Sequence, residues 1–357
     1  MRKFAIMAII LLSLVATACS GADSGANASG SPPNSSQNVG NADSTNASGS
    51  SSQNETSNAK EEQRMSGDYP NKPIRLIVPY APGGATDVAA RVLAGVVNKY
   101  LPQSVVVENK GGGSGTVGTT ELAQSKPDGY TIGIMPSTPL TIQPHLGNVT
   151  YGLDDFEPII RLYNPPQFLF VKSDAPWKTF EEWLEYVRSN PGVFTYGTSG
   201  AGDYQHLAME KLGLEAGLEM KHVAFQSGGQ VVTALLGGHI QGATAFPNTA
   251  QNEIRLIATI GGKRSAFYSE IPTLLELGFN VKSEAPGGLV APKGVPDEVK
   301  QVLHDAFRKA LEDPELIEQF EELKLENYYM NADEYRAYLY ESSEEFKDVL
   351  KSIGLIQ

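Results

Sequence analysis

Cysteine is nearly absent: the 357-residue chain has one, Cys19, near the amino terminus. A single cysteine excludes disulfides within the chain and any metal or redox site that needs several thiols. Histidine is also scarce, with five residues and no His-x-x-x-His spacing, so we expect no zinc site and no other bound metal or cofactor. The cysteine therefore needs a role that one thiol can fill.

Positive charge is in short supply as well. The chain has 28 Lys and Arg residues against 41 Asp and Glu residues, a formal net charge of −13. An acidic protein repels the phosphates of nucleic acids, so we expect no nucleic-acid partner. If the ligand is an anion, as the glycine turns described below indicate, local backbone dipoles must attract it against the overall charge.

The amino-terminal segment has the pattern of a secretory signal peptide. Residues 4–18 form an almost unbroken apolar run that is too short to span a bilayer comfortably. The run follows Arg2 and Lys3 and ends with the small residues Ala-Thr-Ala directly before Cys19. We expect residues 1–18 to be removed and Cys19 to be lipidated, as at a bacterial lipobox. A plain signal peptide with an incidental cysteine is the alternative.

Residues 19–68 are expected to be a disordered linker after the lipidated cysteine. The segment is mostly Ser, Asn, Gly and Ala, and Val39 is its only branched apolar residue. Such a composition cannot bury enough apolar surface to offset the entropy lost on ordering. A long tether from a lipid suits a lipoprotein on the extracellular face of a Gram-positive-type cell membrane.

The rest of the chain alternates strand-like and helix-like segments. This alternation is typical of a largely parallel sheet in an α/β fold, and about 290 residues suit two lobes better than one core. We expect lobe 1 to contain residues 69–170 and 286–357, lobe 2 to contain residues 171–285, and a ligand cleft to lie between them. Strands are expected at residues 74–78, 105–107, 130–135, 168–171, 194–196, 223–225, 241–246, 255–260 and 281–291, and helices at 88–100, 119–125, 178–189, 204–216, 230–236, 296–312, 314–323 and 332–353.

Two glycine turns, one in each lobe, are the strongest candidates for a binding site. The first includes Gly83 and Gly84 between a strand and a helix, where glycine angles and a helix start point amide hydrogens outward. The second, residues 196–203, adds the hydroxyls of Thr198 and Ser199. Either turn alone could be structural. Two on facing lobes favour a site that grips a small carboxylate or phosphate.

A third glycine stretch, residues 113–118, fits G-x-G-x-x-G, but the next strand ends without the acidic residue that a dinucleotide site requires. No catalytic constellation stands out, and there is no G-x-S-x-G elbow. His206 is interpreted as a helix-start residue near the cleft rather than a general base, and Asp87 as a cap or water-binding group rather than a nucleophile. We therefore expect no enzyme activity; an exported hydrolase is a minor alternative.

The folded part resembles the Bug family, the extracytoplasmic solute receptors of tripartite tricarboxylate transporters. Residues 69–87, YPNKPIRLIVPYAPGGATD, match the opening of that family. The match continues in order over essentially all of residues 69–357. Further matching blocks are VENK at residues 107–110, PDGY at 127–130, DFEPI at 155–159, YGTSG at 196–200, HLA at 206–208, LLGG at 235–238, IPT at 271–273, ELG at 276–278 and APKGVP at 291–296.

The resemblance implies a two-lobed, type II-like periplasmic-binding-protein fold, shaped like a clam shell, that holds a small carboxylated solute in the cleft. It also implies a monomer that delivers the solute to the membrane permease subunits of a tripartite transporter. A surface receptor that senses or scavenges a small organic acid is the alternative function. By motif position the expected ligand contacts are Ala81, Gly83, Gly84, Thr86, Asp87, Ser137, Thr198, Ser199, Gly200, His206 and Gln226.

The chain departs from the family in one region. Family members often have Tyr-Lys-Gly where this chain has Phe225, Gln226 and Ser227, and Asp where Gln241 stands. The segment 246–255 is also shorter than usual. Loss of the lysine removes a carboxylate partner, so the ligand is expected to carry fewer charges than a tricarboxylate.

Overall fold

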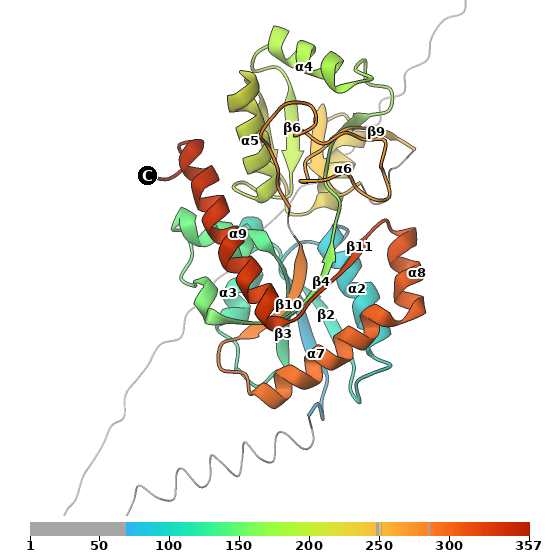
Figure 1. The fold of residues 1–357 in the computed structure, drawn as a ribbon, viewed down its shortest axis with the longest axis vertical. Helices are drawn as coiled ribbons and strands as arrows, with labels where there is room; N and C mark the ends of the chain where they lie inside the picture. Colours follow the sequence, from blue (N-terminus) through green and yellow to red (C-terminus); the bar gives the residue numbers. More distant parts are fainter. Residues whose placement is uncertain (1–68, 248–249, 251, 285) are drawn as a thin grey trace, which may run out of the picture. The chain divides into compact units, whose positions relative to one another are not determined.

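The computed structural model describes residues 69–247, 250, 252–284 and 286–357 (Figure 1). The signal peptide, Cys19 and the linker predicted over 19–68 lie outside the described residues. Within the described ranges the chain forms two α/β lobes, each with its own sheet, which confirms the predicted fold class. No helix in these ranges is both long and apolar enough to cross a membrane.

The first lobe is built on a six-stranded sheet in the order β11-β4-β10-β3-β1-β2. Only β1 pairs in parallel, with β2 and β3; the three other pairings are antiparallel, so the expectation of a largely parallel sheet is wrong for this lobe. The chain leaves the lobe through β4 and returns beside it through β10, so these two strands must run in opposite directions. The strands are β1 (Ile74–Val78), β2 (Val105–Asn109), β3 (Thr131–Pro136), β4 (Phe156–Asn164), β10 (Gly287–Pro292) and β11 (Glu326–Met330).

Helices cover this sheet with apolar faces at helical spacing. In α7, Val299, Leu303, Phe307 and Ala310 are buried and pack in the lobe's main core. Residues spaced by three and four share one helix face, which is why this segment could be predicted from its sequence. The helices of this lobe are α2 (Ala85–Val97), α3 (Thr116–Ala123), α7 (Asp297–Glu312), α8 (Pro314–Glu322) and α9 (Ala332–Ser352), with short helical turns η1 (Gly113–Gly115), η2 (Thr138–Ile142), η3 (Gln143–Leu146) and η4 (Leu153–Asp155).

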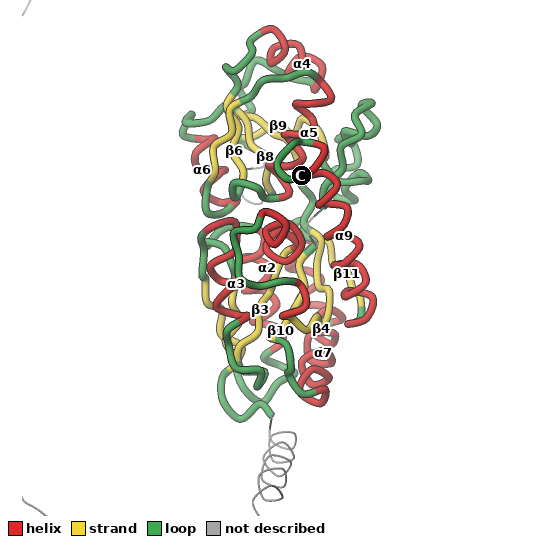
Figure 2. The backbone as a smooth tube through the Cα atoms, turned by 90° about the vertical axis from the view of Figure 1, so that its left-hand side faces the viewer, coloured by secondary structure: helices red, strands yellow, loops and turns green. Residues whose placement is uncertain are grey.

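The second lobe has a five-stranded sheet in the order β7-β6-β8-β5-β9, with helices on both faces (Figure 2) and a core under each. In the central strand β5, Leu169 and Val171 join the core under α4 and α5, whereas Phe168 and Phe170 join the core under α6. This alternation is the period of two of a strand buried on both sides. The elements are β5 (Phe168–Lys172), α4 (Phe180–Ser189), β6 (Thr195–Thr198), α5 (Tyr204–Ala216), β7 (Lys221–Ala224), α6 (Gly228–Leu236), β8 (Gly242–Ala245) and β9 (Ile254–Thr259).

The carboxyl-terminal helix α9 connects the two lobes. Its first half places Tyr335 and Leu339 in a core of lobe 1. Its second half places Phe346 and Leu350 against Leu207 of α5 in lobe 2. Figure 1 shows α9, in red, ending beside α5. The helix thus packs against both sides of the cleft.

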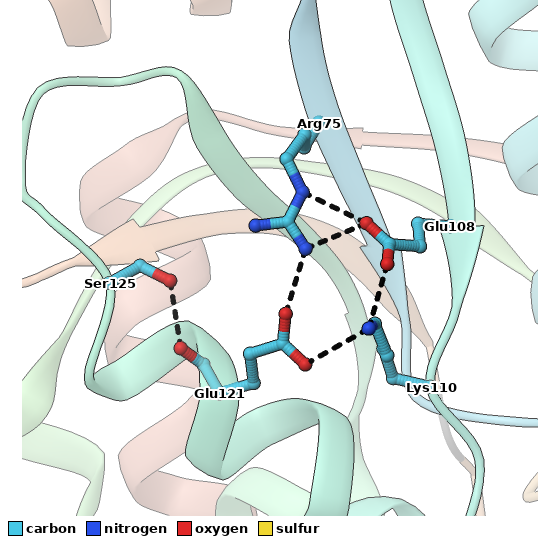
Figure 3. A network of polar contacts seen from close by, with 5 residues as sticks. All are labelled: Arg75, Glu108, Lys110, Glu121 and Ser125. Atoms are coloured by element: carbon cyan, nitrogen blue, oxygen red, sulfur yellow. Dashed lines mark hydrogen bonds and ion pairs between the residues drawn. The ribbon is translucent and has the colours of Figure 1, made fainter.

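Away from the cleft, an ion-pair network ties three segments of lobe 1 together (Figure 3). Arg75 of β1 contacts Glu108 of β2 at 2.6 Å and Glu121 of α3 at 2.7 Å, and Lys110 contacts Glu108 at 2.7 Å. Hydrogen bonds from Lys110 and Arg75 hold the pKa of Glu108 below its ordinary value. Because these side chains are about one-third to one-half exposed, water screens the network and its contribution to stability is small.

Candidate functional site

The first glycine turn leads directly into α2, which starts at Ala85 rather than at Val88 as predicted. Gly83 has φ +92°, a left-handed angle that requires glycine, and Gly84 is the N-cap in an extended conformation. No side chain among the described residues caps this helix. The amino end of α2 therefore presents backbone N–H groups and the positive end of its dipole to the cleft.

Asp87 stabilises this turn from inside. Its carboxylate accepts hydrogen bonds from the Gly83 amide at 2.9 Å and the Asn109 side chain at 2.9 Å, and it pairs with Arg91 at 2.9 Å. Burial opposes ionisation of this carboxyl, but these three contacts hold the pKa of Asp87 below its usual range. Asp87 is thus a charged structural anchor that fixes the turn rather than a cap for α2.

The second glycine turn leads into α5, whose N-cap is Asp203. The Asp203 carboxylate accepts the backbone N–H of His206 at 2.7 Å and the hydroxyl of Ser199 at 2.9 Å. Asp203 is fully buried, and burial raises its pKa to about 6 although both hydrogen bonds act in the opposite direction. The second turn therefore contains a buried carboxyl group one hydroxyl away from the cleft.

A third helix start, that of α6, meets the first turn across the cleft. The amide of Ala81 donates to the carbonyl of Gln226 at 3.2 Å, and the hydroxyl of Ser227 donates to the carbonyl of Pro82 at 3.3 Å. A Cβ atom added at Gly84 would lie 3.3 Å from the amide nitrogen of Gly228. The amino ends of α2 and α6 are therefore in direct contact in this closed arrangement.

Between these helix starts the structure encloses a small cavity of about 40 Å³. That volume is enough for a few water molecules or a very small solute. Within the part of the chain that the structure describes, no charged side chain and no histidine lines this cavity. Its lining consists of Tyr80, Gly84, Ala85, Thr86, Pro136, Pro165, Gln167, Ser199, Tyr204, Gln205, Gly228 and Phe246.

The structure brings three of the predicted ligand contacts, Gly84, Thr86 and Ser199, to the cavity wall. Ala81 and Gln226 form a hydrogen bond beside the cavity, and the Asp87 carboxylate accepts the Gly83 amide within the first glycine turn. Ser137 is buried directly after the lining residue Pro136. The role of each as a ligand contact stays a prediction.

The remaining predicted contacts, Thr198, Gly200 and His206, belong to the internal hydrogen bonds of the second turn. The hydroxyl of Thr198 donates to the carbonyl of Gly200 at 2.9 Å. The ring Nδ1 of His206 accepts the amide of Gly202 at 3.0 Å, and the ring stacks on His222 with centroids 3.9 Å apart. These three residues hold the turn in shape and do not line the cavity.

The stacked histidine pair is a feature that the sequence did not reveal. Burial, and then the neighbouring His206 ring, lower the pKa of His222 to about 4. The ring of His222 lies 2.9 Å from the Thr198 hydroxyl. Within the described residues there is no group of three or more His, Cys, Asp and Glu residues arranged to hold a metal ion. The pair supports the second turn.

Sequence reasoning also missed two glutamines at the cavity wall. The side-chain amide of Gln205 donates to the side-chain oxygen of Gln167 at 2.6 Å, and both residues are about 3% exposed. Gln167 lies in the segment that joins β4 to β5, 38 positions away from Gln205. Only the fold brings these residues together, so no local pattern could have indicated the pair.

The third glycine stretch, which fits G-x-G-x-x-G, lies at a contact between the two lobes. Ser114 adopts a left-handed conformation with φ 55° and donates its hydroxyl to the carbonyl of Ala201 in the opposite lobe at 2.6 Å. A Cβ atom at Gly200 would lie only 2.2 Å from that hydroxyl oxygen. The stretch therefore forms a lobe-to-lobe contact beside the second turn.

Comparison with known proteins gives consistent matches. The family model described as "Tripartite tricarboxylate transporter family receptor" matches residues 89–355. The "UPF0065 protein in gbd 5'region" of Cupriavidus necator is 37% identical over 298 residues, which are 82% of this chain and 91% of that protein. The solved structure of the periplasmic binding protein BugD has a TM-score of 0.76 at 28% identity and covers 81% of this chain and 99% of its own. The R. palustris protein Rpa4515, solved with adipate, has the same fold, with a TM-score of 0.74 at 24% identity over 80% of this chain and 99% of its own.

Proposed function

We propose that this chain, which belongs to the tripartite tricarboxylate transporter receptor family, captures a small carboxylated solute outside the cytoplasm and delivers it to a membrane transporter. The predicted resemblance to the Bug family is confirmed by these matches. The family consists of solute receptors, and its solved members include a periplasmic binding protein. We propose a binding role without catalysis.

The uncapped amino end of α2 is the observation that carries the proposal. Gly84, Ala85 and Thr86 line the cavity, and no described side chain caps the helix that they begin. A carboxylate placed there accepts backbone N–H groups and lies at the positive end of the helix dipole. Each hydrogen bond to a charged group contributes on the order of 1.5–3 kcal/mol.

Two further features support an enclosed ligand between the lobes. The cavity is bounded by lobe 1 residues such as Thr86 and by lobe 2 residues such as Ser199. The lobes touch through the Ala81–Gln226 and Ser114–Ala201 hydrogen bonds, so a ligand inside would be removed from water. The adipate-bound R. palustris protein indicates that this fold can hold a small carboxylate.

The transporter and the membrane are the proposed partners of a monomeric receptor. The family description names a transporter, which supports permease subunits as the recipients of the solute. The small residues before Cys19 support a lipid anchor at the extracellular face of the cell membrane. Changing Cys19 to Ala is expected to move the protein out of the detergent phase in a partitioning assay, and unchanged partitioning would contradict the anchor.

The proposed site is tested by amide NMR of the ¹⁵N-labelled protein titrated with small carboxylates. We expect the amide protons of Ala85 and Thr86 to move downfield as the ligand binds, because they gain a charged acceptor. The amide of Glu315 is the matched control, since it starts α8 and already donates to the Asp313 carboxylate at 2.9 Å. Binding without any shift at Ala85 and Thr86 would place the carboxylate elsewhere.

A further inference from the structure

The three helix starts at the cavity differ in how they are capped. The start of α5 is occupied by the carboxylate of Asp203, which accepts the His206 N–H at 2.7 Å. The start of α6 is capped by the hydroxyl of Ser227, which accepts the Gln230 N–H at 3.4 Å. Only α2 has no side-chain cap among the described residues. Of these three helix starts, α2 is thus the one at which no described side chain takes the place of a ligand carboxylate, and it belongs to lobe 1.

The lobe 2 wall presents acceptors where a second carboxylate would need donors. The Ser199 hydroxyl has one hydrogen, and both of its acceptors, Asp203 Oδ2 and Gln205 Oε1, lie inside the protein at 2.9 Å. The backbone N–H of Ser199 lies 3.2 Å from the side-chain oxygen of Gln205. Because this N–H can only donate, the side-chain amide of Gln205 must turn its oxygen, and not its NH₂ group, toward Ser199. Ser199 therefore turns an oxygen lone pair toward the cavity rather than a hydrogen.

A buried negative charge lies behind this wall. Asp203 is fully buried and hydrogen-bonded to Ser199, which lines the cavity. Burial raises the pKa of Asp203 to about 6, so the carboxyl is ionised at pH 8. Among the described residues, the titratable groups that interact with Asp203 are His206, Tyr80, Tyr196 and Tyr204, and none of them is a lysine or an arginine. None of the described residues that line the cavity has a cationic side chain.

We infer that the solute carries a single carboxylate, bound at α2, and that its other end is a hydrogen-bond donor facing Ser199: a hydroxyl, an amide or an ammonium group. The inference rests on the proposed carboxylate site and names the class of solute that the site selects. A second carboxylate would be desolvated without a counter-charge and would approach Asp203, and both effects weaken its binding. The second lobe therefore lowers the affinity for dicarboxylates relative to donor-ended monocarboxylates.

Calorimetric titrations at pH 8 with ligands of matched length test this selectivity. The probes are succinate, succinamate and 4-aminobutyrate, and the shorter set malonate, malonamate and β-alanine. Within a set, we expect a donor-ended monocarboxylate to bind at least tenfold more tightly than the dicarboxylate. A dicarboxylate that binds as tightly as its donor-ended partners would overturn this inference and leave the proposed function standing. Absence of binding by either kind would overturn the proposed function together with the inference.

Asp203→Asn tests the cause of the selectivity. Asparagine keeps an oxygen to cap α5, removes the negative charge and turns an N–H toward Ser199, where it occupies a lone pair of the serine oxygen. The serine hydrogen then goes to Gln205 Oε1, which lies at 2.9 Å. We expect the affinity for a donor-ended monocarboxylate, divided by the affinity for the dicarboxylate of the same length, to fall at least tenfold. The matched control is Asp313→Asn, because Asp313 caps α8 in lobe 1 and does not line the cavity. That control should leave the ratio unchanged.

A second variant covers the case in which Asp203→Asn is poorly folded. Ser199→Ala removes the acceptor but leaves the Asp203 cap of α5 in place. We expect donor-ended ligands to lose about tenfold in affinity and dicarboxylates to lose little. Equal losses for both kinds of ligand, or an unchanged ratio in a folded Asp203→Asn protein, would overturn the inference.

Discussion

At the scale of single residues, the cleft offers the proposed anion the backbone N–H groups at the start of α2 rather than the charged side chain of a lysine or arginine. Asp87 and Asp203 are acidic groups beside the cavity, and each acts on one of the two glycine turns. Asp87 fixes the backbone that starts α2, and Asp203 occupies the start of α5. An acidic protein can therefore offer an anion a local positive potential although no lysine or arginine is among the described residues of the cavity wall.

Asp203 also predicts how stability depends on pH. Its pKa is raised from an ordinary value near 3.8 to about 6 in the folded protein, because burial disfavours the charged form. Protonated Asp203 stabilises the folded protein relative to the unfolded chain. This stabilisation is fully present below about pH 4 and is lost as the pH rises through 6. Two pKa units correspond to roughly 3 kcal/mol in the free energy of unfolding.

His222 changes the free energy of unfolding with pH in the opposite direction, over a similar pH range. Its folded pKa is lowered to about 4, so the stability of its neutral form is present above about pH 6.5 and is lost as the pH falls toward 4. Urea unfolding of the wild type and Asp203→Asn at pH 4, 5, 6 and 7 separates the two groups. We expect the wild type to gain roughly 2–3 kcal/mol relative to the variant between pH 7 and pH 4. A constant difference would show that Asp203 does not titrate in this range.

Residue-level reading of the sequence found part of the site. The first glycine turn could be predicted because a strand, two glycines and a helix start are adjacent in the chain, and Gly84 and Thr86 do line the cavity. Gln167 and Gln205 were missed because their contact depends on the fold. Local sequence predicts Asp203 only as the end of a turn, because its complete burial depends on the fold.

At the scale of elements, buried amphipathic segments were predictable and strands with mixed composition were not. The bounds of α5 agree with the prediction, and those of α7 differ by one residue at its start. The strand β4 was missed because it contains Pro158 and Arg161, which are unusual in a strand interior. The edge strand β11 was missed because Asn327, Tyr328 and Tyr329 are exposed and do not alternate. The predicted strand over 281–291 begins only at Gly287.

The carboxyl-terminal half of α9 is expected to stabilise the folded protein through its contact with lobe 2. Leu350 is fully buried beside Phe346 and Leu207, so Leu350→Ala should lower the free energy of unfolding by about 2–5 kcal/mol. Leu355→Ala is the control, because Leu355 is 48% exposed and its loss should cost less than about 0.5 kcal/mol. Equal stability of the two variants in urea would mean that this half of α9 does not hold lobe 2.

At the scale of the whole molecule, the chain is a two-lobed member of the receptor family, and its binding of an anion at a helix start is our proposal. The comparisons assign the family, and the fold places the two glycine turns and a third helix start around one cavity. Pairing of strands far apart in the chain could not be derived from composition, which is why the mixed first sheet was not foreseen. The predicted two lobes depended only on length and on the alternation of elements.

The central claim, that the open start of α2 binds the carboxylate, is tested most directly by titrating Gly84→Asp. Gly84 has φ −87° and ψ 172°, an N-cap conformation that aspartate adopts readily, so its carboxylate would occupy the place proposed for the ligand. Gly84→Asn is the uncharged comparison. Asn331→Asp is the control, since it changes the cap of α9, at the far end of that helix from its contact with lobe 2.

We expect Gly84→Asp to be no more stable than the wild type, because the gain of a cap is offset by the close approach of the new Cβ to the Gly228 amide nitrogen, 3.3 Å away. Its affinity for the carboxylate ligand, measured by calorimetry, should fall at least about a hundredfold, since about two hydrogen bonds to a charged group are lost. Gly84→Asn should lose less, and Asn331→Asp should bind like the wild type. Wild-type affinity in a folded Gly84→Asp protein would contradict the account.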